Sequence, residues 1–179
     1  PLPRWRHSAN VFDATSIVIF GGFYSSTNRF NDIHIFDTVS LSWAQPVEQQ
    51  SDFTPRGNHI PKKNAWPFCP TPRGAHSANI VDSKMYIFGG YGGSGYSRRD
   101  FNDMYALDLA SFSWQKVKAA GKAPEARSGH TACVVGKNIF IFGGWNSNSQ
   151  FNDLHLFETS TCSWQQTEFG FGPPRWNHG

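Results

Sequence analysis

Seven histidines and three cysteines are the side chains of this 179-residue chain best suited to bind a metal or to act in catalysis. Five of the histidines follow an arginine by three positions, and four of the five recur at one position of a repeated unit. These four are His7, His76, His130 and His178, while the fifth, His59, lies outside the repeat. A histidine that returns at one position of a repeated unit is explained first by structure, so we expect these four to hydrogen-bond backbone groups of neighbouring strands.

The remaining histidines and the cysteines form no catalytic set. His34 and His155 alternate with apolar residues, which favours a structural role inside strands. The cysteines lack the paired spacing of a disulfide framework and have no evident basic neighbour. They are Cys69, Cys133 and Cys162, of which Cys133 is expected to be a small buried residue. We predict no catalytic residue, no metal ligand and no cofactor.

A short apolar run that ends in two glycines organises the chain and occurs three times. The copies span residues 17–22, 85–90 and 139–144. Runs that are apolar throughout and rich in β-branched and aromatic residues predict strands covered on both faces. Two glycines can leave such a strand at positive φ and let a neighbouring strand pack closely against them.

Other landmarks keep their order around each run. An Arg-x-x-His motif precedes it, an Asn-Asp pair follows it, and a tryptophan stands eleven positions after each of these aspartates. The tryptophans are Trp43, Trp114 and Trp164. We expect all three to be buried, because a buried indole removes a large apolar area from water. Each copy therefore predicts four short strands separated by turns.

This set of landmarks resembles the kelch repeat, a four-stranded blade of a β-propeller. The resemblance covers residues 3–168 and begins again at Arg175. It implies an all-β fold, a kelch-type β-propeller segment of four-stranded antiparallel blades. The expected parts are blade 1 at residues 1–47, a proline-rich insertion at 48–72, blade 2 at 73–120, blade 3 at 121–168 and the start of a fourth blade at 169–179.

The repeat count and the composition also limit which partners and locations we expect for this chain. Propellers typically close with four to eight blades, so we expect the remaining blades of the same propeller to belong to a longer chain. A net charge of +3 is too small and dispersed to favour nucleic acid. No run of eighteen apolar residues predicts a membrane span. Cysteine usage favours the cytoplasm, and association with the cytoskeleton, as in several kelch proteins, and a nuclear location stay open.

One face of the predicted blades gathers cationic and aromatic residues. In an antiparallel blade the start of the first strand and the end of the second lie on the same side. The residues concerned are Arg4, Arg73, Arg127 and Arg175, with Phe23, Tyr91 and Trp145 directly after the glycine pairs. Their positions resemble those by which protein-recruiting kelch propellers hold acidic peptides. In the alternative, each arginine bridges adjacent blades.

The resemblance and the absence of a catalytic set predict a protein–protein interaction module or scaffold and not an enzyme. It would bind an acidic or polar peptide segment of a partner on the face with the repeat arginines and post-glycine aromatics. The alternative is a kelch-propeller enzyme whose axial metal or cofactor site is supplied by blades outside this sequence. Fold alone does not separate these functions.

Overall fold

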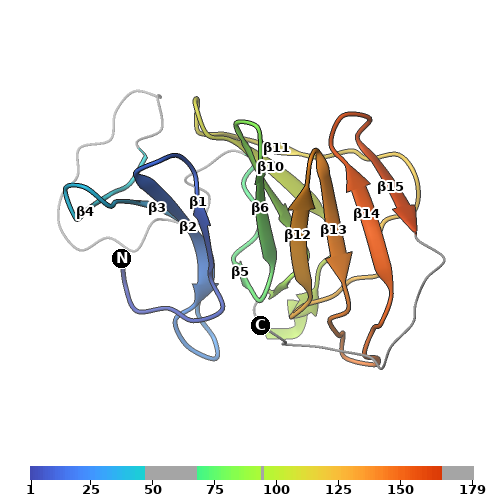
Figure 1. Cartoon of the computed structure of the whole chain (residues 1–179). Coiled ribbons are helices and arrows are strands. Elements are labelled where there is room, and N and C mark those ends of the chain that lie inside the picture. The colour runs from blue at the N-terminus through green and yellow to red at the C-terminus, as the bar shows by residue number, and fades with distance from the viewer. Residues whose placement is uncertain (47–67, 94, 167–179) are drawn as a thin grey trace.

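The computed structural model describes residues 1–46, 68–93 and 95–166. Regular structure in these ranges is β apart from one 3₁₀ turn, η1 (Gly95–Ser97). It forms three four-stranded antiparallel sheets that stand side by side (Figure 1). The expected all-β fold of four-stranded blades is confirmed. Arg175, the start of the fourth blade at 169–179 and most of the insertion at 48–72 lie outside the described residues.

Each blade is a simple meander in which strands adjacent in sequence are hydrogen-bonded neighbours. Blade 1 contains β1 (Ser8–Val11), β2 (Ser16–Phe23), β3 (Arg29–Asp37) and β4 (Ser42–Ala44). Blade 2 contains β6 (Ser77–Val81), β7 (Lys84–Phe88), β10 (Met104–Asp108) and β11 (Ser113–Lys116). Blade 3 contains β12 (Thr131–Val135), β13 (Asn138–Phe142), β14 (Leu154–Glu158) and β15 (Ser163–Gln166). The first strand of blade 2, β6, contacts both β1 and β12.

A short second ladder extends each blade beyond its glycine pair. In blade 2 it is a three-stranded sheet of β5 (Arg73–Gly74), β8 (Tyr91–Gly92) and β9 (Arg99–Asp100). In blades 1 and 3 the contact between β5 and β8 corresponds to one antiparallel bridge, Trp5 to Phe23 and Ser128 to Trp145. The contact between β8 and β9 corresponds to the pairing of Phe23 with Arg29 in blade 1 and of Trp145 with Gln150 in blade 3. Two-residue strands have no periodicity in sequence, so the pattern did not predict this ladder.

The hydrophobic core lies between the blades. The interface of blades 1 and 2 buries Val18, Phe20, Ile33, Met85, Ile87, Leu107, Leu109 and Trp114. The interface of blades 2 and 3 buries Val81, Phe88, Met104, Ile139, Ile141, Phe157 and Trp164. Successive side chains of a strand point to opposite faces, and β7 accordingly gives Met85 and Ile87 to blade 1 and Phe88 to blade 3. This sharing explains why the repeated run is apolar at every position.

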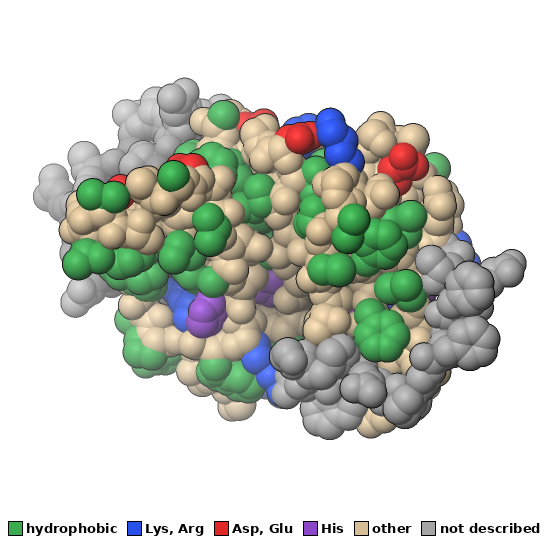
Figure 2. Space-filling view, in the orientation of Figure 1, with side chains coloured by type: hydrophobic (Ala, Val, Ile, Leu, Met, Phe, Trp, Pro, Cys, Tyr) green, Lys and Arg blue, Asp and Glu red, His purple; other side chains and the backbone are tan. Residues whose placement is uncertain are grey.

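The repeat tryptophan packs on the preceding blade. Trp114 lies against Phe20 and Trp164 against Phe88, with ring centroids 5.2 and 5.1 Å apart. Both tryptophans are 6% exposed, whereas Trp43 is 49% exposed. The expectation that Trp43 is buried was wrong, because no blade of the described chain precedes blade 1. Figure 2 shows hydrophobic side chains gathered over the left of the view, where blade 1 lies.

Blade 3 has no described blade on its opposite flank. Cys133, Val134 and Val135 of β12 are exposed. The expectation that Cys133 is buried was therefore wrong, for the same physical reason that applies to blade 1. Burial of a repeat position depends on the adjacent blade as well as on the residue itself.

Removing the indole should be costly only where a preceding blade covers it. We expect Trp114→Ala to lower the free energy of unfolding by about 3 to 5 kcal/mol through the cavity it leaves. Trp43→Ala, at the same repeat position but half exposed, should cost about 1 kcal/mol or less. Urea unfolding of both variants measures the difference. Equal losses would show that the tryptophan acts inside its own blade.

The glycine pairs allow two close approaches to the backbone. All six glycines have φ between 63° and 99°. They are Gly21, Gly22, Gly89, Gly90, Gly143 and Gly144. A Cβ on Gly89 would lie 2.8 Å from the carbonyl oxygen of Arg127 in the next blade. A Cβ on Gly90 would lie 2.8 Å from the Cβ of His76 in its own blade. The first glycine thus lets the backbone of the next blade approach closely, and the second lets the residues before the first strand of its own blade do so.

Gly89→Ala should destabilise the chain by roughly 3 kcal/mol or more, since it combines left-handed strain with a clash against backbone. Gly136→Ala is the matched control. Gly136 has φ 61°, but a Cβ there would meet nothing within 4 Å. It should therefore cost only the conformational strain, about 1 kcal/mol. Denaturant midpoints that shift equally for both variants would exclude the close approach as the cause.

Candidate functional site

The repeat arginines are bonded inside their own blades. Arg73 Nη1 donates to the carbonyl oxygen of Gly89 at 2.9 Å and to Asp103 Oδ1 at 2.6 Å, and Nη2 donates to Asp103 Oδ2 at 3.2 Å. Arg127 donates in the same way to Gly143 and Asp153, and Arg4 to Gly21 and Asp32. Each guanidinium also lies over the phenylalanine of the Phe-Asn-Asp segment, 4.1 to 4.2 Å from the ring centroid.

The burial of these arginines favours a positioning role over the binding role expected from sequence. The side chains of Arg73 and Arg127 are 0% exposed and that of Arg4 is 5% exposed. Their donors bond to groups of the same blade, and among the described residues no guanidinium of the three bonds to an adjacent blade. A buried bidentate pair of this kind fixes geometry, because losing one member leaves the other charge uncompensated.

Histidines extend the ion pairs of blades 1 and 3. His34 Nε2 lies 2.9 Å from Asp32 Oδ2, and His155 Nε2 lies 2.8 Å from Asp153 Oδ2. Burial raises the pKa of Asp32, but hydrogen bonds from His34 and Arg4 outweigh it and lower the pKa to about 2. The structural role predicted for both histidines agrees with these contacts. In the part of the chain that the structure describes, no three His, Cys, Asp or Glu side chains are grouped to hold a metal ion.

The Arg-x-x-His histidines join neighbouring blades. His76 Nε2 lies 2.9 Å from the hydroxyl of Ser8 in blade 1, and His130 Nε2 lies 2.9 Å from that of Ser77 in blade 2. We expected contacts with backbone groups, whereas the observed partner is a serine side chain of the preceding blade. Burial lowers the pKa of both histidines to about 3, with a further contribution from the arginine of the same motif.

Neutral buried histidines predict loss of stability in mild acid. In the unfolded chain these imidazoles regain an ordinary pKa of 6.5, so the unfolded state binds more protons between pH 6.5 and about 3. The contribution of these neutral histidines to the free energy of unfolding is fully present above pH 6.5. It is lost progressively as the pH drops through this window. We expect the free energy of unfolding to fall by roughly 2 kcal/mol per histidine between pH 7 and pH 5. Urea unfolding of wild type and His130→Gln tests this, because an unchanged pH dependence in the variant would exclude His130 as its source.

The post-glycine aromatics differ in how much surface they offer. Phe23 is 5% exposed, since Gly74 of blade 2 lies so close that a Cβ there would be 2.8 Å from its ring. Tyr91 is partly buried and Trp145 is 37% exposed. Phe23 therefore packs between blades, while Tyr91 and Trp145 contribute to the surface.

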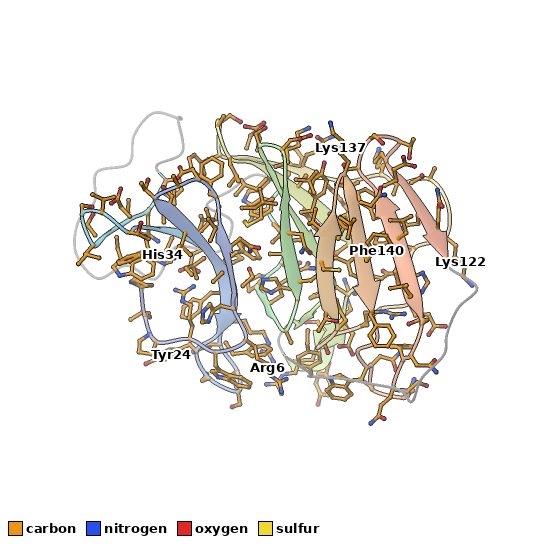
Figure 3. All side chains as sticks on the ribbon, viewed as in Figure 1. Arg6, Tyr24, His34, Lys122, Lys137 and Phe140 are labelled. Atoms are coloured by element: carbon orange, nitrogen blue, oxygen red, sulfur yellow. The ribbon has the colours of Figure 1, made fainter. Side chains whose placement is uncertain are left out.

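We call the loops that follow the glycine pairs, residues 23–29, 91–100 and 145–150, the loop face. Tyr24 is 52% exposed there and Tyr96 is fully exposed. Tyr24 lies at the end of the blades opposite Lys137 (Figure 3). Asp100 is the sole acidic residue in the sequence of these loops. Burial raises the pKa of Asp100.

Three arginines of the loop face escaped the sequence analysis. Arg29 lies 5.2 Å from the ring centroids of both Phe23 and Tyr91 and donates to the carbonyl oxygen of Gly93 at 3.2 Å, so it ties blade 1 to blade 2. Burial lowers its pKa, and the nearby charge of Arg98 lowers it further. Arg98 and Arg99 are exposed. None of the three arginines forms an ion pair with a described acidic side chain.

The sequence matches the KLHDC2/KLHL20/DRC7 Kelch-repeats domain over residues 61–179. The chain belongs to the kelch-repeat family. It is 34% identical over 149 residues to Kelch domain-containing protein 3 of Rattus norvegicus, covering 80% of this chain and 35% of that protein. It is 34% identical over 151 residues to human Host cell factor 2, covering 81% and 18%. It is 29% identical over 145 residues to Tip elongation aberrant protein 1 of Schizosaccharomyces pombe, covering 80% and 11%.

Membership of the family supports a general role in protein interaction. Kelch-repeat domains are generally interaction modules and not enzymes. The chain spans about a third of the length of the rat relative and less of the other two. The names of these three proteins do not point to a common partner. The family thus gives the fold and the class of role, while the partner must be argued from this chain's own surface. No helix in the described ranges is long and apolar enough to cross a membrane.

Proposed function

We propose that this chain is a protein-interaction module whose loop face holds an acidic or polar segment of a partner protein. The observation that carries the proposal is that Arg29, Arg98 and Arg99 form no ion pair with a described acidic side chain. The same loop face carries Tyr91, Tyr96 and Trp145. Arg98 and Arg99 supply accessible guanidinium groups, and the rings supply flat apolar area. Arg4, Arg73 and Arg127 act beneath this surface as positioning residues.

The chemistry of the loop face suits carboxylates. A guanidinium binds a carboxylate through two parallel hydrogen bonds, and aromatic side chains add contact area with little loss of rotamer freedom. Arginine, tyrosine and tryptophan are the residues enriched among those that dominate binding energy at interfaces. An acidic segment would also relieve the repulsion between Arg29 and Arg98, which have no described acidic partner.

The loop face is held in place before any partner arrives. The backbone nitrogen of Trp145 donates to the carbonyl oxygen of Ser128 at 3.0 Å, and that of Ser128 donates back to Trp145 at 2.9 Å. Arg29 fixes the first loop to Gly93 of the second. Ordering a loop on binding costs free energy, so loops that are already anchored favour tight association. We place the interaction in the cytoplasm, with the cytoskeleton as one setting.

The test is capture of partners by the intact chain carrying changes on the loop face. Arg98→Glu with Arg99→Glu, and separately Trp145→Ala, should each weaken binding by about 1 to 4 kcal/mol. The charge variant should also reduce the dependence of binding on salt. Lys122→Glu is the control, since it makes a like charge change at an exposed residue outside the loop face.

Circular dichroism and thermal melts establish that each variant is folded. The proposal is overturned if both loop-face variants bind partners as wild type does, while changes around residues 37–42 or 108–113, at the other end of the blades, abolish binding. In that case the interaction surface is formed by the turns at that end of the blades, and the loop arginines have no part in it.

A further inference from the structure

A groove of about 420 Å³ lies between blades 2 and 3. Its floor is formed by Tyr86 of β7 and Phe157 of β14, whose ring centroids are 5.9 Å apart. Thr159 and Cys162, in the turn between β14 and β15, line the blade 3 side. This turn is at the end of the blades opposite the loop face, so the groove is separate from the surface proposed above.

The equivalent place between blades 1 and 2 is filled by side chains of the repeat. Leu109 stands where blade 3 has Thr159, and Phe112 stands where blade 3 has Cys162. Leu109 is 2% exposed and belongs to the core of the first interface, with Phe112 packed against it. Both replacements in blade 3 are smaller. These replacements leave open part of the space that a leucine and a phenylalanine occupy one blade earlier.

The floor of the groove is also more aromatic than its counterpart. Tyr86 takes the place of Val18, and Phe157 takes the place of Leu107. Two rings offer an entering aromatic side chain both apolar area and edge-to-face contacts. A ring that entered from a partner would restore the packing that Phe112 provides in the first interface.

The rim of the groove is positively charged. Lys84, Lys116 and Lys118 line it and are exposed, and no Asp or Glu is among the lining residues. The ammonium of Lys116, however, lies over the ring of Tyr105, 5.9 Å from its centroid, so Lys84 and Lys118 supply the charge of the rim. None of these lysines forms an ion pair with a described residue, whereas nearby Lys137 pairs with Asp82 at 3.3 Å. Asp108 is opposite Lys84 in the ladder, but it accepts three hydrogen bonds from its own turn.

We infer that this groove is a second binding site, which takes an aromatic side chain flanked by carboxylates from an acidic segment of a partner protein. The ring occupies the space left by Cys162 and Thr159, on Tyr86 and Phe157. The flanking carboxylates lie near the ammonium groups of Lys84 and Lys118. Shape selects the aromatic side chain, and charge selects its acidic neighbours.

Cys162→Phe fills the groove with the side chain that the repeat uses elsewhere. Cys162 and Phe112 have φ of 54° and 52°, so the backbone at this position already carries a phenylalanine in blade 2. Cys162→Ser is the matched control, since it removes the thiol and leaves the groove open. Lys84→Gln with Lys118→Gln removes charge at exposed positions without filling the space.

The probe is a fluorescein-labelled peptide of sequence Glu-Asp-Phe-Asp-Glu, titrated by fluorescence anisotropy. Titrations use the wild-type chain and also the Arg98→Glu, Arg99→Glu chain, in which the loop face no longer attracts the peptide. In both backgrounds we expect saturable binding that Cys162→Phe and Lys84→Gln/Lys118→Gln each weaken at least tenfold. Cys162→Ser should change the affinity less than twofold.

Two further peptides separate the contributions of shape and charge. Replacing the phenylalanine of the probe with alanine, or its acidic residues with lysine, should each weaken binding at least tenfold. Thermal melts should show Cys162→Phe as stable as wild type or more so. If that variant does not fold, the alanine peptide and the lysine variant decide the matter. Absence of saturable binding, or equal binding of the alanine peptide, overturns the site.

Discussion

The close approach at the double glycine is the constraint on which the other repeat contacts depend. Gly89 has the carbonyl oxygen of Arg127 and the ring of His130 against it, and Gly90 has the Cβ of His76 against it. Because a Cβ on either glycine would displace backbone, the spacing between blades is set here. That spacing brings the histidine within hydrogen-bonding distance of a serine in the preceding blade. It also brings Trp164 onto Phe88, the residue directly before the glycine pair.

The repeat contacts fall into two groups. One group stabilises a single blade: it consists of the arginine–aspartate pair and the carbonyl oxygen to which the arginine donates. The other group joins neighbouring blades: it consists of the contacts of the histidine, the tryptophan and the apolar run. A blade therefore has little core of its own, and its stability comes largely from the neighbours it touches. The half-exposed Trp43 and the exposed β12 are the direct consequence, since each belongs to a flank without a described neighbour.

Periodicity and spacing predicted the four-stranded blades, the glycine conformation and the structural role of the histidines, because those features recur in every copy. The partner of the repeat arginine was also present in the pattern, since each of the three blades has one Arg-x-x-His motif and one Asn-Asp pair. Spacing alone does not say which groups bond. Burial of Trp43 was mispredicted because it depends on a neighbouring blade. Arg29, Arg98 and Arg99 were missed because non-repeating loop residues carry no periodic signal.

Where a position repeats, packing or internal bonding accounts for it, as with Arg73 in its ion pair and His76 on Ser8. Surface free for recognition is then supplied by positions that depart from the repeat. Arg98 and Arg99 belong to a loop, residues 91–100, that is longer than its counterparts in the other two blades. Cys162 stands where blade 2 has a phenylalanine that packs against the first interface. In a chain whose blades share one architecture, such departures change the surface without disturbing the glycine contact that spaces the blades. The same argument explains why arginines chosen for their regularity were found inside the blades.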